Sequence, residues 1–131
     1  MSELGGGYML QAYSLNLTVP AESNVQFDNV CLNKCNNSKL SGPSSIELNV
    51  CGVYKVSVDA TASASTTLQL YKDGVAMPQA QSTGTSLHFD TYVQVPKNNC
   101  GCPCSSPTII KLFNSTEVTF TNVNMVIRKE A

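Results

Sequence analysis

Residues 51–74, CGVYKVSVDATASASTTLQLYKDG, decide the fold of this chain. In the first half, apolar positions alternate with polar ones, and this period of two predicts a half-buried strand. The apolar positions are Tyr54, Val56, Val58 and Ala60. Small residues fill 62–65, and a second extended run follows at 67–72. Asp73-Gly74 then predicts a tight hairpin turn, because glycine tolerates the positive φ that such a reversal needs.

The same alternation recurs along the rest of the chain. It predicts strands over 8–19, 46–50, 87–95, 108–113 and 117–129, with shorter ones near 25–29 and 75–80. We expect loops over 31–42, 81–86 and 96–107, where Gly, Pro, Asn and Ser gather. No segment has a helical period. The sequence therefore predicts an all-β sandwich or barrel of about eight to ten antiparallel strands.

Two strands carry more detailed expectations. In the first, Leu15, Leu17 and Val19 share one face, and Ser14 lies on the other. In the last, the apolar parity slips, so we expect a bulge or kink near Asn122.

Composition excludes several classes of function. The chain has 131 residues, a formal net charge of −1 and no run of like charges, so neither nucleic acid nor a polybasic membrane contact is expected. No stretch reaches the roughly 20 apolar residues of a membrane span, and the start has no signal-peptide pattern. We expect residues 1–7 to be a flexible lead and residues 8–131 to be a single domain.

Two motifs resemble a known family. Residues 52–57, GVYKVS, resemble the Gly-x-Tyr strand of C1q and tumour-necrosis-factor-like domains, and residues 68–74, LQLYKDG, resemble the next strand and turn of that family. Residues 123–129 are similar to its closing strand. The resemblance covers residues 8–129, and the small bacterial and phage members look nearest, including the head domains of spore-surface collagen-like proteins.

The resemblance implies a ten-strand jelly roll that assembles as a homotrimer and serves as a binding head or surface decoration, not as an enzyme. This chain departs from the family pattern in three ways. It has no collagen-like Gly-x-y stalk, its cysteine-rich loop is not a family feature, and no carboxylate cluster matches a calcium site.

The cysteines are the sharpest local feature. Three lie within five residues, and the full set is Cys31, Cys35, Cys51, Cys100, Cys102 and Cys104. Disulfide bonds within or between protomers are the favoured interpretation, because such frameworks are typical of extracellular proteins. A zinc site at Cys100, Cys102 and Cys104 is an alternative, since tetrahedral zinc accepts thiolates, and free thiols are a third. Six cysteines can pair in about 15 ways, and the sequence does not choose among them.

Other side chains give weaker signals. His88 and Asp90 share a strand face, but no Gly-x-Ser-x-Gly elbow supplies a nucleophile, so we expect a polar sheet face rather than a hydrolase. Three sequences fit the N-glycosylation pattern, at Asn16, Asn36 and Asn114. The aromatic candidates for a trimer interface are Tyr8, Tyr13, Tyr92 and Phe113.

Together these features predict a non-enzymatic, trimeric surface protein of a phage virion, either a capsid decoration or a fibre head. Its partners would be further copies of itself and a capsid or fibre protein, and it would lie on the virion surface or outside the cell. One alternative is a bacterial or spore-surface adhesion head that binds a glycan or a protein. Another is a metal-binding protein built on the cysteine loop.

Overall fold

The computed structural model describes residues 9–33, 38–40, 44–48, 52–95 and 108–130. Residues 1–7, expected to be a flexible lead, lie outside this part. The described elements are all strands: β2 (Met9–Val19), β3 (Ser23–Asn24), β4 (Asn29–Asn33), β5 (Ser38–Leu40), β6 (Ile46–Leu48), β7 (Gly52–Lys72), β8 (Val75–Val95), β9 (Thr108–Asn114) and β10 (Val118–Lys129).

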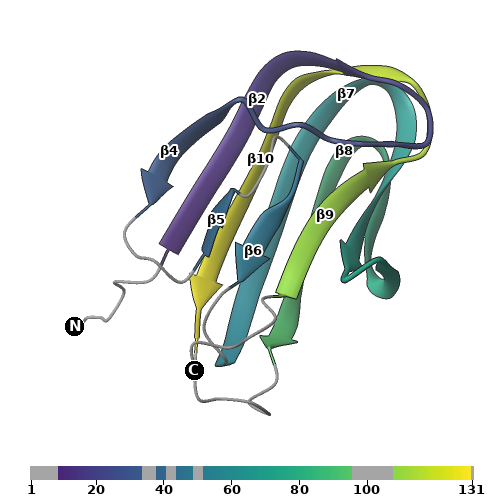
Figure 1. The fold of residues 1–131 in the computed structure, drawn as a ribbon. Coiled ribbons are helices and arrows are strands. Elements are labelled where there is room, and N and C mark those ends of the chain that lie inside the picture. Colours follow the sequence, from purple (N-terminus) through teal and green to yellow (C-terminus); the bar gives the residue numbers. More distant parts are fainter. Residues whose placement is uncertain (1–8, 34–37, 41–43, 49–51, 96–107, 131) are drawn as a thin grey trace.

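The strands form one antiparallel sheet that curls over on itself into two facing layers (Figure 1). The β2 layer contains β4, β2, β10, the first part of β7 and the second part of β8. The β9 layer contains β5, β6, β9 and β3, with the second part of β7 and the first part of β8. The predicted all-β jelly-roll fold is confirmed.

The two long strands cross from one layer to the other together. Their pairing is interrupted between Thr61 and Thr66, within the run of small residues, and Gly84 of β8 lies opposite Thr66. Gly84 has φ +136, a conformation that a side chain with a Cβ rarely adopts. The expectation of a loop at 81–86 is wrong, because β8 continues through these residues as it bends.

The predicted turn at Asp73-Gly74 joins β7 to β8. Asp73 and Gly74 have φ values of +51 and +83. The Asp73 backbone N–H donates to the Ile109 carbonyl at 2.8 Å, and Asp73 Oδ1 accepts from the Ile109 N–H at 2.9 Å. The turn is therefore held against the neighbouring strand β9.

Two irregularities determine which side chains of β10 and β2 face the core. The predicted bulge in β10 is confirmed by a register shift between Phe120 and Asn122 in the pairing with β7. In β2, Asn16 has φ +52, so the even-numbered residues face the core before it and the odd-numbered residues face the core after it. Ser14 is buried and Leu15 is 56% exposed. The expectation that Leu15 shares an inward face with Val19 is therefore wrong.

Two shorter segments also differ from expectation. The predicted loop over 31–42 contains the end of β4 and all of β5. The strand expected near 25–29 is instead split between β3 and β4, and the residues between them are not in a strand. Val25 and Phe27 are still buried, as part of the hydrophobic core.

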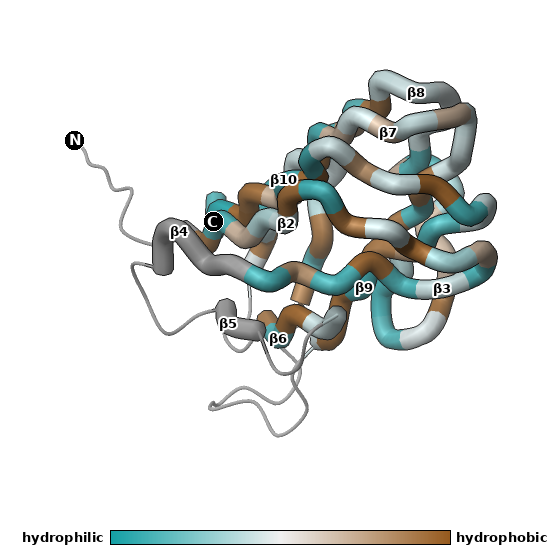
Figure 2. The backbone as a smooth tube through the Cα atoms, turned by 90° about the horizontal axis from the view of Figure 1, so that it is seen from above, coloured by the Kyte–Doolittle hydropathy of each residue, from teal (hydrophilic) through white to brown (hydrophobic). Residues whose placement is uncertain are grey.

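The core fills the space between the two layers. Its largest fully buried side chains include Tyr54, Leu68, Leu112, Phe120 and Met125, which come from both layers. Figure 2 shows the alternation of apolar and polar residues along the strands that produces this arrangement. Each fully buried side chain of this size contributes about 1.5–3 kcal/mol of transfer free energy.

The side chain of a buried asparagine forms hydrogen bonds that connect several strands at one end of the sandwich. The Asn114 side chain, at the end of β9, is fully buried. Its Oδ1 accepts from the Thr66 hydroxyl at 2.6 Å, and its Nδ2 donates to the carbonyls of Thr116 at 2.7 Å and of Val19 and Pro20 at 3.2 Å each. The burial excludes Asn114 as a glycosylation acceptor in the folded protein, whereas Asn16 is exposed.

Candidate functional site

The outer face of the β2 layer carries a regular array of side chains from four neighbouring strands. The register brings residues of β2, β10, β7 and β8 into rows across the sheet. One row is Tyr13, Asn124, Asp59 and His88, and the next is Gln11, Val126, Ser57 and Asp90. Most of these side chains are polar, as expected of a sheet face turned towards solvent.

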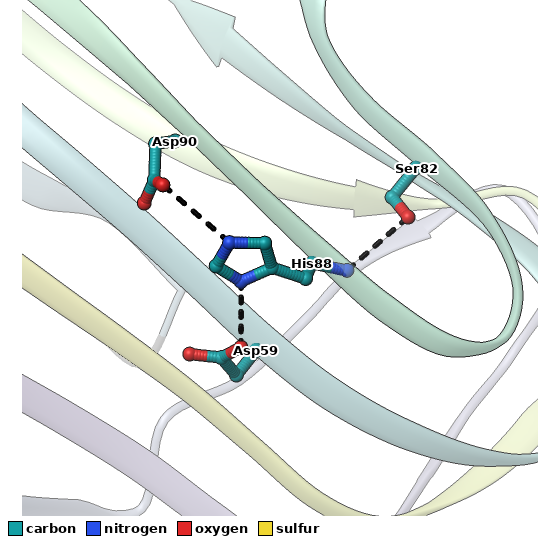
Figure 3. Close-up of polar contacts among 4 residues, drawn as sticks. All are labelled: Asp59, Ser82, His88 and Asp90. Carbon is teal, nitrogen blue, oxygen red and sulfur yellow. Dashed lines mark hydrogen bonds and ion pairs between the residues drawn. The ribbon is translucent and has the colours of Figure 1, made fainter.

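His88 lies between two carboxylates on this face (Figure 3). Its Nδ1 is 2.7 Å from Asp59 Oδ1 on β7, and its Nε2 is 3.4 Å from Asp90 Oδ2 on β8. The hydrogen bond with Asp59, together with the negative charges of both carboxylates, raises the pKa of His88 above its ordinary value of 6.5. A hydrogen bond from Ser57, supported by the charge of His88, lowers the pKa of Asp90.

This cluster does not have the geometry of a hydrolase. In a catalytic triad, one ring nitrogen of the histidine faces a hydroxyl nucleophile and the other faces a carboxylate. Here both ring nitrogens face carboxylates, and the Ser82 hydroxyl accepts from the backbone N–H of His88 at 3.2 Å. The cluster is an exposed ion-paired group, and such groups add little to the stability of a single chain.

The same outer face also exposes large apolar side chains. Leu15 is 56% exposed and Tyr92 is 59% exposed. Tyr13 is half-buried and lies beside Leu15 in a hollow of about 360 Å³, which is completed by Gln11, Asn122 and Asn124. Tyr13 and Leu15 are neighbours on β2, and such an apolar group within a polar surface is typical of protein interaction sites, whereas Tyr92 lies apart from them at the other end of the face. This outer face is the candidate functional site.

The aromatic residues expected at a trimer interface fall into separate places. Tyr13 and Tyr92 both lie on the outer face of the β2 layer. Phe113 points outward from the β9 layer, where it pairs with Tyr71, and Tyr8 lies outside the described residues. The sequence reasoning missed Leu15, whose outward direction depends on the backbone conformation of Asn16.

The predicted cysteine site lies outside the described part of the chain. The backbone of Cys31 belongs to β4, but its side chain is not described, and neither are Cys35, Cys51, Cys100, Cys102 and Cys104. Disulfide bonds, a zinc site and free thiols therefore all stay predictions. Within the described residues, no group of three or more His, Cys, Asp or Glu side chains could hold a metal ion.

Solved structures reveal what this fold is similar to. The globular domain of zebrafish complement 1qA superposes with a TM-score of 0.70 at 8% identity, over 95% of this chain and 98% of that one. Murine APRIL superposes with a TM-score of 0.67 at 9% identity, over 93% of this chain and 98% of that one. The chain has the C1q/tumour-necrosis-factor-like jelly-roll fold.

A third structure with this fold is a viral one. The PRD1 vertex protein P5 superposes with a TM-score of 0.64 at 11% identity, over 98% of this chain and all of that one. No protein-family model and no curated protein matches the sequence. Across the described C1q/tumour-necrosis-factor-like fold, no helix is long and apolar enough to cross a membrane.

Proposed function

We propose that the protein is a non-enzymatic module that assembles as a homotrimer through the outer face of the β2 layer. We further propose that the trimer is displayed on a phage virion, as a capsid decoration or a fibre head. The observation that carries the assembly is the exposure of large apolar side chains on this face, with Leu15 beside Tyr13 on β2 and Tyr92 on β8. In an oligomer these side chains leave water at two places on the face, and the His88 cluster lies between them.

The open edge of β8 supports the same assembly. Among the described strands, β8 pairs only with β7, so its other side is an unpaired edge along the whole of its length. Long open edges invite uncontrolled pairing with other chains. A closed three-fold ring, in which the edge of the second part of β8, from Ser86 to Val95, packs against the outer face of the next protomer, covers the edge of the β2 layer and leaves the first part of β8, with Val75, outside the interface.

The similarity to a phage vertex protein and to C1q and tumour-necrosis-factor ligands supports a place on a virion or outside a cell. Genes for capsid and portal proteins beside the gene of this protein would support the virion role. Neighbouring genes for a collagen-like stalk or for sporulation would instead support the alternative, a bacterial or spore-surface adhesion head.

A binding role rather than a catalytic one agrees with the geometry at His88, where each ring nitrogen contacts a carboxylate. The cysteines fit this role as well. After release from the cell into oxidising surroundings, disulfide bonds among them would lock the assembled trimer.

Matched substitutions at two exposed apolar residues test the proposed interface. Tyr92→Glu places a charge on the outer face of the β2 layer, and Val75→Glu places one at a similarly exposed position beside the β7–β8 turn, in the β9 layer. We expect Tyr92→Glu to raise the trimer dissociation constant at least tenfold in analytical ultracentrifugation, because it removes an aromatic contact and takes a charge out of water, which is costly even when Lys55, its neighbour on β7, pairs with it. Val75→Glu should leave it unchanged. Equal behaviour of the two variants would refute the interface.

A further inference from the structure

The outer face of the β9 layer contains a hollow of about 590 Å³, on a different surface from the proposed trimer interface. Side chains of β3, β7 and β9 and the turn at Asp73-Gly74 line it. The register explains why they meet, because Tyr71 pairs with Lys111 across β7 and β9, and Asn24 pairs with Phe113 across β3 and β9. The volume is within the range of about 300–1,000 Å³ found for small-molecule sites.

One wall of the hollow is aromatic. The ring centroids of Tyr71 and Phe113 are 5.5 Å apart, and the ring planes are inclined by 57°. Both side chains are half-buried, so they are fixed by packing and still present ring surface to the hollow. Such a wall offers a flat apolar contact to a ligand that has one apolar face, such as the C–H face of a pyranose ring.

Polar groups surround this wall. Asp73 lines the hollow, and its Oδ1 accepts from the Ile109 N–H, so its second carboxylate oxygen is a further acceptor. The Asn24 amide offers both a donor and an acceptor, and the Lys111 ammonium group offers donors. Within the described part of the chain, neither Asn24 nor Lys111 has a side-chain hydrogen bond or an ion pair.

The charges of the hollow select the class of ligand. Asp73 and Lys111 contribute one negative and one positive charge, which sum to zero. A ligand with one charge is attracted by one of these groups and repelled by the other, so the net charge of the hollow favours neither sign. A neutral ligand with several hydroxyl groups can instead use the acceptor of Asp73 and the donors of Lys111 at once.

We propose that this hollow binds a neutral pyranose residue at the end of a surface glycan, with the ring packed on Tyr71 and its hydroxyl groups bound by Asn24, Asp73 and Lys111. This goes beyond the proposed function, because it assigns a ligand to a surface that the trimer interface does not use. It does not depend on the oligomeric state.

A titration followed by ¹H–¹⁵N NMR tests the ligand class with the full-length protein. The neutral probes are the methyl glycosides of glucose, galactose, mannose and N-acetylglucosamine, and glucuronate and glucosamine are the anionic and cationic counterparts on the same ring. We expect at least one neutral probe to bind with a dissociation constant near 1 mM, about −4 kcal/mol, and to shift the amide signals of Tyr71, Lys111 and Phe113. Failure of all four neutral probes, or tighter binding of a charged one, would overturn the proposal.

Variants then locate the site. Tyr71→Ala should weaken binding about three- to tenfold, since an aromatic contact of this kind contributes on the order of 1 kcal/mol. Asn24→Ala keeps the aromatic wall and provides a second test if Tyr71→Ala folds poorly. Glu117→Ala, at an exposed position outside both the hollow and the proposed trimer interface, is the control and should bind normally. Loss of binding in Glu117→Ala, or normal binding in both other variants, would refute the site.

A glycan array distinguishes a sugar at the end of a surface glycan from a free sugar in solution as the ligand. Binding to immobilised glycans that end in the neutral sugar supports a surface ligand, whereas binding of the free methyl glycoside alone contradicts it. Light scattering on the same samples keeps this proposal apart from the proposed function. A monomer that binds the sugar refutes the trimer alone, and a trimer that binds none of the probes refutes the glycan site alone.

Discussion

Replacement of Asn114 by alanine should destabilise the protein more than any comparable change at an exposed polar residue. Asn114 is fully buried, and it joins the end of β9 to Thr66 of β7 and to the chain after β2. Asn114→Ala removes one acceptor, which binds Thr66, and two N–H donors, which serve the carbonyls of Thr116, Val19 and Pro20. At about 1 kcal/mol for each of these three groups, the loss of unfolding free energy is about 3 kcal/mol.

Urea unfolding followed by circular dichroism measures this loss, at one fixed protein concentration because assembly also contributes to stability. For a chain of 131 residues, such a loss lowers Tm by about 10 °C. Asn114→Asp keeps an acceptor for Thr66 but removes the donors and buries a charge beside carbonyls, so it should be worse than Asn114→Ala. Gln79→Ala, at an exposed position in the first part of β8, should change stability by less than about 0.5 kcal/mol. A loss below about 1 kcal/mol in Asn114→Ala would refute the reasoning.

Three further outcomes are expected. Because Asp59 raises the pKa of His88, the ion pair between them stabilises the folded protein fully below the ordinary pKa of about 6.5, and this stabilisation is lost as pH rises through the raised pKa. In such an exposed pair its contribution to the free energy of unfolding stays under about 1 kcal/mol. NMR titration of the single histidine should show the raised pKa, and Asp59→Asn should lower it. Gly74 has φ +83, so Gly74→Ala should lower the free energy of unfolding by about 1 kcal/mol, and Gly74→Asn should lower it less. Thermal unfolding measures both changes. Mass spectrometry of unreduced protein should show a loss of about 2 mass units for each disulfide among the cysteines.

The sequence predicts most of the strands because one face of each is buried. Where that condition holds, as from Tyr54 to Ala60 and from Leu87 to Val95, a period of two marks both the strand and its inward face. The bulge in β10 was visible for the same reason, since the inward apolar residues change parity after Phe120.

The errors arise where the pattern hides a change in the backbone. In β2, Leu15 continues the apolar alternation of Leu17 and Val19, and this pattern hides the positive φ of Asn16 that turns Leu15 outward, although asparagine adopts positive φ more often than most residues with a Cβ. In β8, residues 81–86 are polar and include Gly84, which is typical of a loop. These residues continue the pairing with β7 nonetheless, because β7 bends between Thr61 and Thr66, opposite this part of β8.

The candidate sites depend on pairing between distant strands and could be predicted only in part. Tyr13 and Tyr92 were identified as aromatic anchors, but only the register of four strands shows that they share a face with the cluster at His88. The hollow between Tyr71 and Lys111 combines residues that are distant in sequence, and no local pattern marks it.

The mass of the assembled protein tests the proposed assembly most directly. One chain is 14.0 kDa, so a homotrimer is about 42 kDa. Light scattering coupled to size exclusion, at micromolar concentration and under reducing conditions, measures this mass without any contribution from disulfide bonds. A single species of about 42 kDa is the expected result. A single species at the mass of one chain would contradict the assembly of this protein through the outer face of the β2 layer.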